Sequence, residues 1–317
     1  FGAKAASGIV LITTTKGGIG KPTINFSTKI GMAEPAQDRM PLGPEEFIQF
    51  RKDWFRTDFP DKPYHFYTEP ENLPSDVSID EWRSYGDAPL PDDTDEWMAR
   101  MRFFPIEQEN YLAGRTVNWY DVVMRQGLRQ EYDLSLSGGT EQTQYYWSIG
   151  YLNNEGIRVG DEYSTVRSRM NVEHKVANWL SVGVNTHFFD RDESSVPGSL
   201  GFFTNGPYGR EFDEEGNVER YPHGHTDHPL LDYYRTDRLR KVNGLFANIY
   251  ADFKLPLGIT YKFSFQPRYE TMKDFQFIST EKAVGGVPAD LSEGTREQYT
   301  HYEWIIDNLL KWNKEIG

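Results

Sequence analysis

Period-two alternation of apolar and polar residues is the feature that most constrains this chain. In the segment ITYKFSFQPRYE one face carries Ile259, Tyr261, Phe263, Phe265 and Tyr269, and the other carries Thr260, Lys262, Ser264, Gln266, Arg268 and Glu270. Successive side chains of a strand point to opposite faces, so the pattern predicts a strand with one apolar and one polar face. The same alternation recurs at 23–32, 132–136, 145–151, 166–176, 180–188, 245–253 and 302–306.

The connections between these segments alternate in length. Short turns are expected at 137–142, 176–180 and 254–258, and long connections at about 33–127, 153–163, 190–239 and 271–297. An up-and-down meander with its short turns at one end has this rhythm, and so does a transmembrane β-barrel with short periplasmic turns and long extracellular loops. A soluble sandwich also alternates inward and outward residues. The charged second face and the length of 33–127 favour the barrel.

Charge and composition exclude several other classes of protein. The net charge is −14, which argues against a nucleic-acid partner because such a partner requires a basic surface. The chain has no cysteine, so it offers no disulfide, thiolate zinc site or cysteine nucleophile. No segment is long and apolar enough for a transmembrane helix.

The segment KGGIGK, residues 16–21, looks like a phosphate-binding loop, but its surroundings do not fit one. Such a loop needs a Ser or Thr directly after the final Lys to hold Mg²⁺, and it must open a helix. Pro22 occupies that position, and it offers neither a hydroxyl nor an N–H group. The residues after it alternate as a strand does, so the sequence predicts a glycine-rich turn and no ATP or GTP binding.

Three longer segments carry a resemblance to a known family. FGAKAASGIVLITTTKG (1–17) resembles the end of the plug domain of SusC/RagA-type TonB-dependent outer-membrane transporters. NWYDVVMRQGLRQEYDLSLSGGTEQTQYYWSIGYLNNEGI (118–157) resembles the start of their barrel, and 164–188 resembles the next hairpin. The resemblance implies an all-β fold: an antiparallel up-and-down transmembrane β-barrel portion of about eight strands with long extracellular loops, preceded by the end of a plug domain. The expected domains are the plug end at 1–20 and the first part of the barrel at 21–317, including the long first loop 33–127. The chain is therefore expected to be a piece of a longer protein.

The function implied by this resemblance is nutrient import across the outer membrane of a Bacteroidetes-type bacterium. The cargo would be an oligosaccharide or, as the second possibility, a peptide. The implied partners are a SusD-like surface lipoprotein, TonB (through a part that precedes this sequence) and the lipid bilayer. No enzymatic activity, catalytic residue or cofactor is implied. The alternative function is a soluble β-rich carbohydrate-binding module.

Aromatic residues of the long first loop are the candidates for contact with substrate or partner. Aromatic rings stack on sugar rings, and they also bury against protein, so both roles stay open for Trp54, Tyr64, Phe66, Tyr67 and Trp97. The family topology places this loop outside the cell.

Metal binding is the other chemistry that the loops suggest. His223, His225 and His228 lie close together, and imidazoles at such spacing bind zinc or copper. The surrounding Pro and Gly residues favour a solvated loop instead. The acidic segment 212–219 lacks the regular spacing of a calcium loop, and a turn with Gly216 at positive φ is expected there instead. The acidic segment 91–97 offers carboxylates for weak calcium binding, but a solvated acidic surface is favoured. No metal site is predicted.

Overall fold

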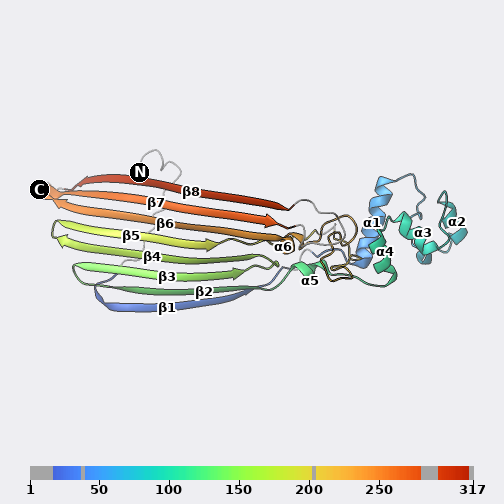
Figure 1. Ribbon diagram of the computed structural model, residues 1–317, viewed down its shortest axis with the longest axis horizontal. Helices are drawn as coiled ribbons and strands as arrows, with labels where there is room; N and C mark the ends of the chain where they lie inside the picture. Colours follow the sequence, from blue (N-terminus) through green and yellow to red (C-terminus); the bar gives the residue numbers. More distant parts are fainter. Residues whose placement is uncertain (1–16, 37–39, 202–204, 280–291, 314–317) are drawn as a thin grey trace.

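The computed structural model describes residues 17–36, 40–201, 205–279 and 292–313. Within these residues, eight strands form one antiparallel sheet in sequence order, from β1 to β8. The strands are β1 (Gly20–Ala33), β2 (Gly127–Gly139), β3 (Thr143–Glu155), β4 (Glu162–Ala177), β5 (Leu180–Asp192), β6 (Thr236–Leu255), β7 (Ile259–Ile278) and β8 (Glu293–Trp312). The antiparallel up-and-down fold class is therefore confirmed, with the short turns at one end of the sheet and the long connections at the other (Figure 1).

The first long connection contains a helical region that the sequence analysis predicted only at its two ends. The sequence predicts helical turns at PEEFIQFR (44–51) and WYDVVMR (119–125), and the structure has α1 (Pro44–Asp58) and α5 (Trp119–Val123) there. Between them lie α2 (Ile79–Ser84), α3 (Asp93–Arg100), α4 (Pro105–Leu112) and the 3₁₀ turn η2 (Pro70–Asn72). We call residues 44–123 the helical cap. A further helix, α6 (Leu231–Arg235), leads into β6, and the 3₁₀ turn η3 (Pro256–Gly258) joins β6 to β7.

A strand follows the apparent phosphate loop, as predicted. β1 runs through Lys21 and Pro22 and pairs with β2 along almost its whole length. The composition of GIVLITT (8–14) predicts a short buried strand, and this segment lies outside the described residues.

The register of the sheet sorts side chains into two faces. One row of paired residues crosses all eight described strands: Phe26, Leu134, Ile149, Ser168, Phe188, Leu245, Tyr269 and Tyr302. The adjacent row points to the opposite side: Ser27, Asp133, Gly150, Arg167, Phe189, Gly244, Glu270 and His301. We call these sides the apolar face and the polar face. Tyr261, Phe263 and Phe265 lie on the apolar face, and Lys262, Ser264 and Gln266 on the polar face, by the same alternation.

The main hydrophobic core lies in the helical cap rather than on the sheet. It consists of Phe47, Phe66, Tyr67, Trp82, Trp97, Met98, Met101, Phe103 and Tyr208. Tyr208 comes from the connection between β5 and β6, so two long connections share this core. Asn110 fixes the join, because its side-chain amide donates to the carbonyls of Tyr208 and Gly209, each at 2.9 Å.

Candidate functional site

The polar face carries two groups of ion pairs. The Arg167 guanidinium binds the carboxylates of Glu131 and, at 3.0 Å, Asp133 on the strand two places away. Lys29 and Arg129 approach Glu131 at 3.9 and 3.7 Å. On the far side of the sheet, Arg268 lies 3.2 Å from both Glu270 and Glu303. Charges spaced in this way suit a hydrated wall rather than a protein core.

Beside these ion pairs the polar face is hollowed by a cavity of about 430 Å³. Arg169, His187, Phe246 and Arg268 line it together with Asn171, Asn185, Asn248, Gln266 and Glu303. The Arg268 guanidinium lies 4.9 Å from the centre of the Phe246 ring, which also stacks on Phe189 at 5.9 Å. The lining therefore offers amide and guanidinium hydrogen-bond donors, carboxylate and amide acceptors, and one aromatic surface. That combination binds polar, uncharged or mixed-charge solutes.

The apolar face is exposed over a wide area. Ile24, Phe26, Trp304 and Leu310 expose 69, 66, 56 and 66% of their surface, and the neighbouring strands add a broad band of partly exposed aliphatic and aromatic residues. A soluble protein rarely exposes a contiguous apolar surface of this extent. This observation counts against the soluble carbohydrate-binding module.

The outer limit of the apolar face runs obliquely across the sheet. The row next to Phe26 reads Thr28, Tyr132, Tyr151 and Val166 on β1 to β4, but Asp190, Asn243, Thr271 and Thr300 on β5 to β8. The polar residues thus begin one row earlier on the later strands. A planar boundary that crosses tilted strands produces such a slope, and membrane barrels tilt their strands by about 35–45°.

Backbone hydrogen bonds tie together the three long connections at this end of the sheet. Val117 N–H donates to the Pro207 carbonyl at 2.8 Å, and Val159 N–H donates to the Val123 carbonyl at 2.9 Å. The Trp119 indole N–H also donates to the Gly206 carbonyl at 2.8 Å. The helical cap, which ends with α5, therefore forms one packed structure with the connections after β3 and β5 (Figure 1).

The five aromatic residues predicted to contact a ligand divide into two groups. Phe66, Tyr67 and Trp97 belong to the core of the helical cap, with 9, 4 and 1% of their surface exposed. Their rings face other protein groups, so the structure assigns them the packing role. Trp54 and Tyr64 are exposed by 56 and 71%, and ligand contact stays a prediction for these two.

The expectation of a solvated loop holds for His225, which is exposed, but it was wrong for the other two histidines. His223 and His228 are 1 and 3% exposed, because the edge of Trp119 packs against both rings. The His228 Nδ1 accepts a hydrogen bond from the Leu230 N–H at 3.0 Å. Burial lowers the pKa of His228 to about 4, so the ring is neutral at pH 7. Among the described residues no group of three or more His, Asp or Glu side chains is placed to hold a metal ion.

The acidic segments of the loops have structural roles in the described residues. Asp92 caps α3 by accepting from the N–H groups of Thr94 and Asp95 at 2.9 and 3.0 Å. In the segment 212–219, Asp213 and Asn217 close a turn in which Gly216 has φ of +84°, as expected.

None of the described helices is long and apolar enough to cross a membrane.

Sequence reasoning did not single out the residues that line the polar-face cavity. The signal was present, since Arg169, His187 and Arg268 occupy alternate positions opposite the apolar residues of their strands. What the pattern lacked was the register, which aligns β4 to β8 at this level.

Comparison with known proteins identifies relatives of the chain. It is 25% identical over 211 residues to the TonB-dependent receptor P39 of Formosa agariphila. This alignment covers 63% of the present chain and 19% of the relative. It is also 20% identical to the TonB-dependent receptor P3 of the same organism, in an alignment that covers 100% of this chain and 28% of the relative. No family model matches the chain.

Solved structures show the same fold. The RagAB peptide importer in its closed-closed state matches with a TM-score of 0.69 and 20% identity, over 100% of this chain and 35% of the matched chain. The open-open state matches with a TM-score of 0.65 and 19% identity, over 98% of this chain and 34% of the matched chain. The resemblance to SusC/RagA-type TonB-dependent transporters is thus confirmed. The relatives are named receptors and an importer, in agreement with the expectation that the chain is not an enzyme. The chain spans 19 and 28% of the length of the two receptors.

Proposed function

We propose that this chain forms part of the wall of a nutrient importer in the outer membrane of a Bacteroidetes-type bacterium. The observation that carries the proposal is the two-faced sheet, apolar toward one side and ion-paired toward the other. The apolar face would contact lipid, because only a lipid environment makes its exposure favourable. The polar face would line the lumen.

The proposed domain division follows from the same geometry. Residues 1–20 would be the end of the plug domain, and 21–317 the first part of the barrel. Gly17 supports this division, because it is buried and lines a small cavity with Asn171, Glu173 and Asn185 on the polar face. The chain therefore reaches β1 from the side of the sheet that would face the lumen, where a plug lies.

The cargo that we propose is an oligosaccharide, with a peptide as the second candidate. The polar-face cavity offers hydrogen-bond donors and acceptors beside the Phe246 ring, and both cargo classes use such groups. The neighbour structures belong to a peptide importer, and the curated relatives are named only as receptors. Uptake of labelled oligosaccharides and of labelled peptides by cells with and without the gene distinguishes the two classes.

The proposed partners are TonB and a SusD-like lipoprotein. The helical cap supports the second partner, since it lies beyond the strand ends where a surface lipoprotein would sit (Figure 1). The exposed Trp54 and Tyr64 side chains on this cap are the proposed contacts with that partner or with the cargo.

Cysteine labelling in intact cells tests the topology on which the proposal depends. The sequence has no native cysteine, so each introduced thiol is unique within these residues. A membrane-impermeant maleimide should label Asp92→Cys and Glu215→Cys, which lie in the long connections, and should spare Thr140→Cys and Asn178→Cys in the short turns. The third short turn is not used, because its Gly258 has a φ of +77° that would strain a cysteine at that position. Equal labelling of all four positions in intact cells would refute the membrane wall.

A further inference from the structure

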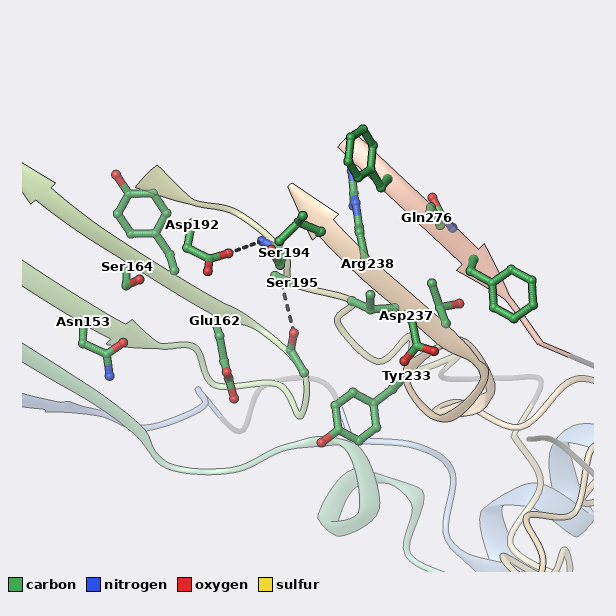
Figure 2. Close-up of a pocket in the computed structure, with 17 residues that line it drawn as sticks. Asn153, Glu162, Ser164, Asp192, Ser194, Ser195, Tyr233, Asp237, Arg238 and Gln276 are labelled. Atoms are coloured by element: carbon green, nitrogen blue, oxygen red, sulfur yellow. Dashed lines mark hydrogen bonds between the residues drawn. The ribbon is translucent and has the colours of Figure 1, made fainter. Parts of the chain in front are cut away.

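A second cavity, of about 700 Å³, lies at the end of the sheet where the neighbouring strand β6 extends beyond β5. The β5–β6 ladder ends at the pair Asp192–Lys241, whereas β6 extends to Thr236. Beyond Asp192 the chain crosses toward the turn between β3 and β4, and Val196 N–H donates to the Gly160 carbonyl at 3.1 Å. The step between the two strands forms the cavity, which we call the rim cavity (Figure 2).

The rim cavity is lined by strand residues from both sides of the sheet, with Tyr163, Arg238 and Gln276 on the side of the polar face and a second set on the side of the apolar face. The second set includes Asn153, Ser164 and Asp192. These three share one register row with Lys241, Lys273 and Gln298, one row beyond Tyr151 and Val166. On this side the cavity therefore begins where the apolar rows end.

The walls of the rim cavity are held in place by hydrogen bonds. Asp192 accepts from the Ser194 N–H at 3.0 Å and lies 3.1 Å from the Lys241 ammonium. Ser194 Oγ accepts from the Arg240 N–H at 2.9 Å, and the Ser195 hydroxyl donates to the Gly160 carbonyl at 3.0 Å. Figure 2 shows Asn153 and Ser164 on one side of the cavity and Arg238 and Gln276 on the other, with Tyr233 at its lower edge.

The lining chemistry fits a neutral sugar. Hydroxyl, amide and carboxylate groups exchange hydrogen bonds with sugar hydroxyls, and the rings of Tyr233 and Phe277, exposed by 42 and 47%, offer flat apolar surfaces. Arg238, the cation of the lining, is paired with Asp274 at 2.9 Å. Two of the lining carboxylates are also paired, Asp192 with Lys241 at 3.1 Å and Glu162 with Arg125 at 3.5 Å. A lining cation that is already matched disfavours phosphates and other anionic groups.

We propose that the rim cavity binds neutral sugar residues at the outer boundary of the membrane. Two sources offer this chemistry: the glycan headgroup of a surface glycolipid, and a free oligosaccharide. The lining residues on the apolar side, Asn153, Ser164 and Asp192, favour the glycolipid, whose acyl chains would lie along the adjacent apolar rows. The location at a membrane boundary rests on the proposed function, whereas the sugar chemistry of the lining does not.

The test uses the full-length protein with three substitutions. Ser164→Trp fills the rim cavity, and Tyr233→Ala removes an aromatic surface without adding bulk. Gln298→Trp is the matched control, because Gln298 shares the register row of Ser164 but does not line the cavity. Binding is measured to phosphatidylethanolamine vesicles that contain lipopolysaccharide with a complete sugar chain, to vesicles with truncated lipopolysaccharide, and to lipid-free polysaccharide.

We expect the wild type to bind the complete lipopolysaccharide at least tenfold more tightly than the truncated form. Ser164→Trp and Tyr233→Ala should each remove this difference, and Gln298→Trp should retain it. Equally tight binding of lipid-free polysaccharide, with the same losses, would identify free sugar as the source. Binding that neither cavity variant changes, or a preference for the truncated, phosphate-rich form, would overturn the proposal. The cysteine labelling described above, made in the same background, tests the membrane wall independently of the sugar site.

Discussion

The helical cap and the strand sheet use the same kinds of apolar side chain in opposite ways. In the cap, Trp82, Trp97 and Met101 are at most 1% exposed, and charged residues cover the outside. On the sheet, Ile24, Trp304 and Leu310 are more than half exposed, and ion pairs occupy the other face. The surface of the cap suits water, whereas the two faces of the sheet suit the proposed position between lipid and a hydrated lumen.

The distribution of charge follows the same division. Residues 44–123 carry 18 acidic and 8 basic side chains, a net charge of −10 out of −14 for the whole chain. Inside the cap, the few buried charges are matched. Glu107 is fully buried and forms a two-pronged pair with Arg51 at 2.9 and 3.0 Å. Buried Arg100 binds Glu96 at 2.6 Å and lies 3.9 Å from the centre of the Trp82 ring.

The largest effect that we expect is on the cap alone. Trp97→Ala should destabilise it by about 3–5 kcal/mol, because the indole is fully packed and its N–H bonds the Tyr67 carbonyl at 3.2 Å. Trp54→Ala, at an exposed position, should change stability by less than about 0.5 kcal/mol. Hydrogen exchange of the full-length protein, read by mass spectrometry, should show faster exchange in 44–123 and unchanged exchange in β2 to β7. Faster exchange throughout the sheet would show that the two regions are not separable.

The second prediction concerns the two faces of β7. Phe263→Arg on the apolar face should cost about 2–4 kcal/mol of stability in bilayers, the amount measured for a cation near the midplane of a membrane barrel. Gln266→Arg on the polar face should cost less than about 1 kcal/mol, because Asp307 already lies 2.8 Å from the Gln266 amide and would pair with the new cation. We prefer Gln266 to Ser264 as the control because Ser264 is only 6% exposed. Equal losses in the free energy of unfolding from vesicles would favour a soluble sandwich.

The third prediction concerns pH and the packed connections next to the cap. The pKa of His228 is about 4 in the folded protein, below the ordinary value of 6.5, so the unfolded chain takes up the proton first as pH falls. Above about pH 6.5, His228 does not lower the free energy of unfolding. As the pH falls from about 6.5 to about 4, His228 lowers this free energy by about 3 kcal/mol at most. Burial raises the pKa of Glu211, which opposes this trend.

The difference between wild type and His228→Gln isolates the histidine from Glu211. Hydrogen exchange of α5, whose Trp119 ring contacts the His228 ring, reports on this region. We expect the wild type to lose stability relative to the variant between pH 6.5 and 4. A constant difference across this range would contradict the lowered pKa.

The sheet could be predicted from the sequence because its signal is local. The alternation of residues 259–270 specifies both faces of β7 without knowledge of its neighbours, and the short turns set the hairpin order. The register of the strands could not be predicted from the sequence, and therefore neither could the polar-face cavity or the rim cavity. Both cavities depend on which residues of different strands lie opposite each other.

The cap was harder to predict because its helices are short and their core is assembled from distant segments. Start signals were nevertheless present: Pro44 and Pro105 occupy first turns, and Ser78 and Asp92 accept hydrogen bonds as N-caps. Tyr67 and Trp97 were considered as ligand contacts because aromatic residues in an acidic loop suggest recognition. No local pattern indicates that Tyr208, more than 100 residues away, would complete their core.

The join between Asn110 and Tyr208 has a consequence for the order of assembly. Asn110 precedes β2 and Tyr208 follows β5, so the two segments meet only after four intervening strands have been laid down with their hairpins on the opposite side. Closing a chain segment of this length costs little more entropy than closing one of half the length, so the join is thermodynamically inexpensive. It is also slow to reach, because contacts between distant residues form late. We therefore expect the join between the cap and the β5–β6 connection to form after the hairpins of β2 to β5.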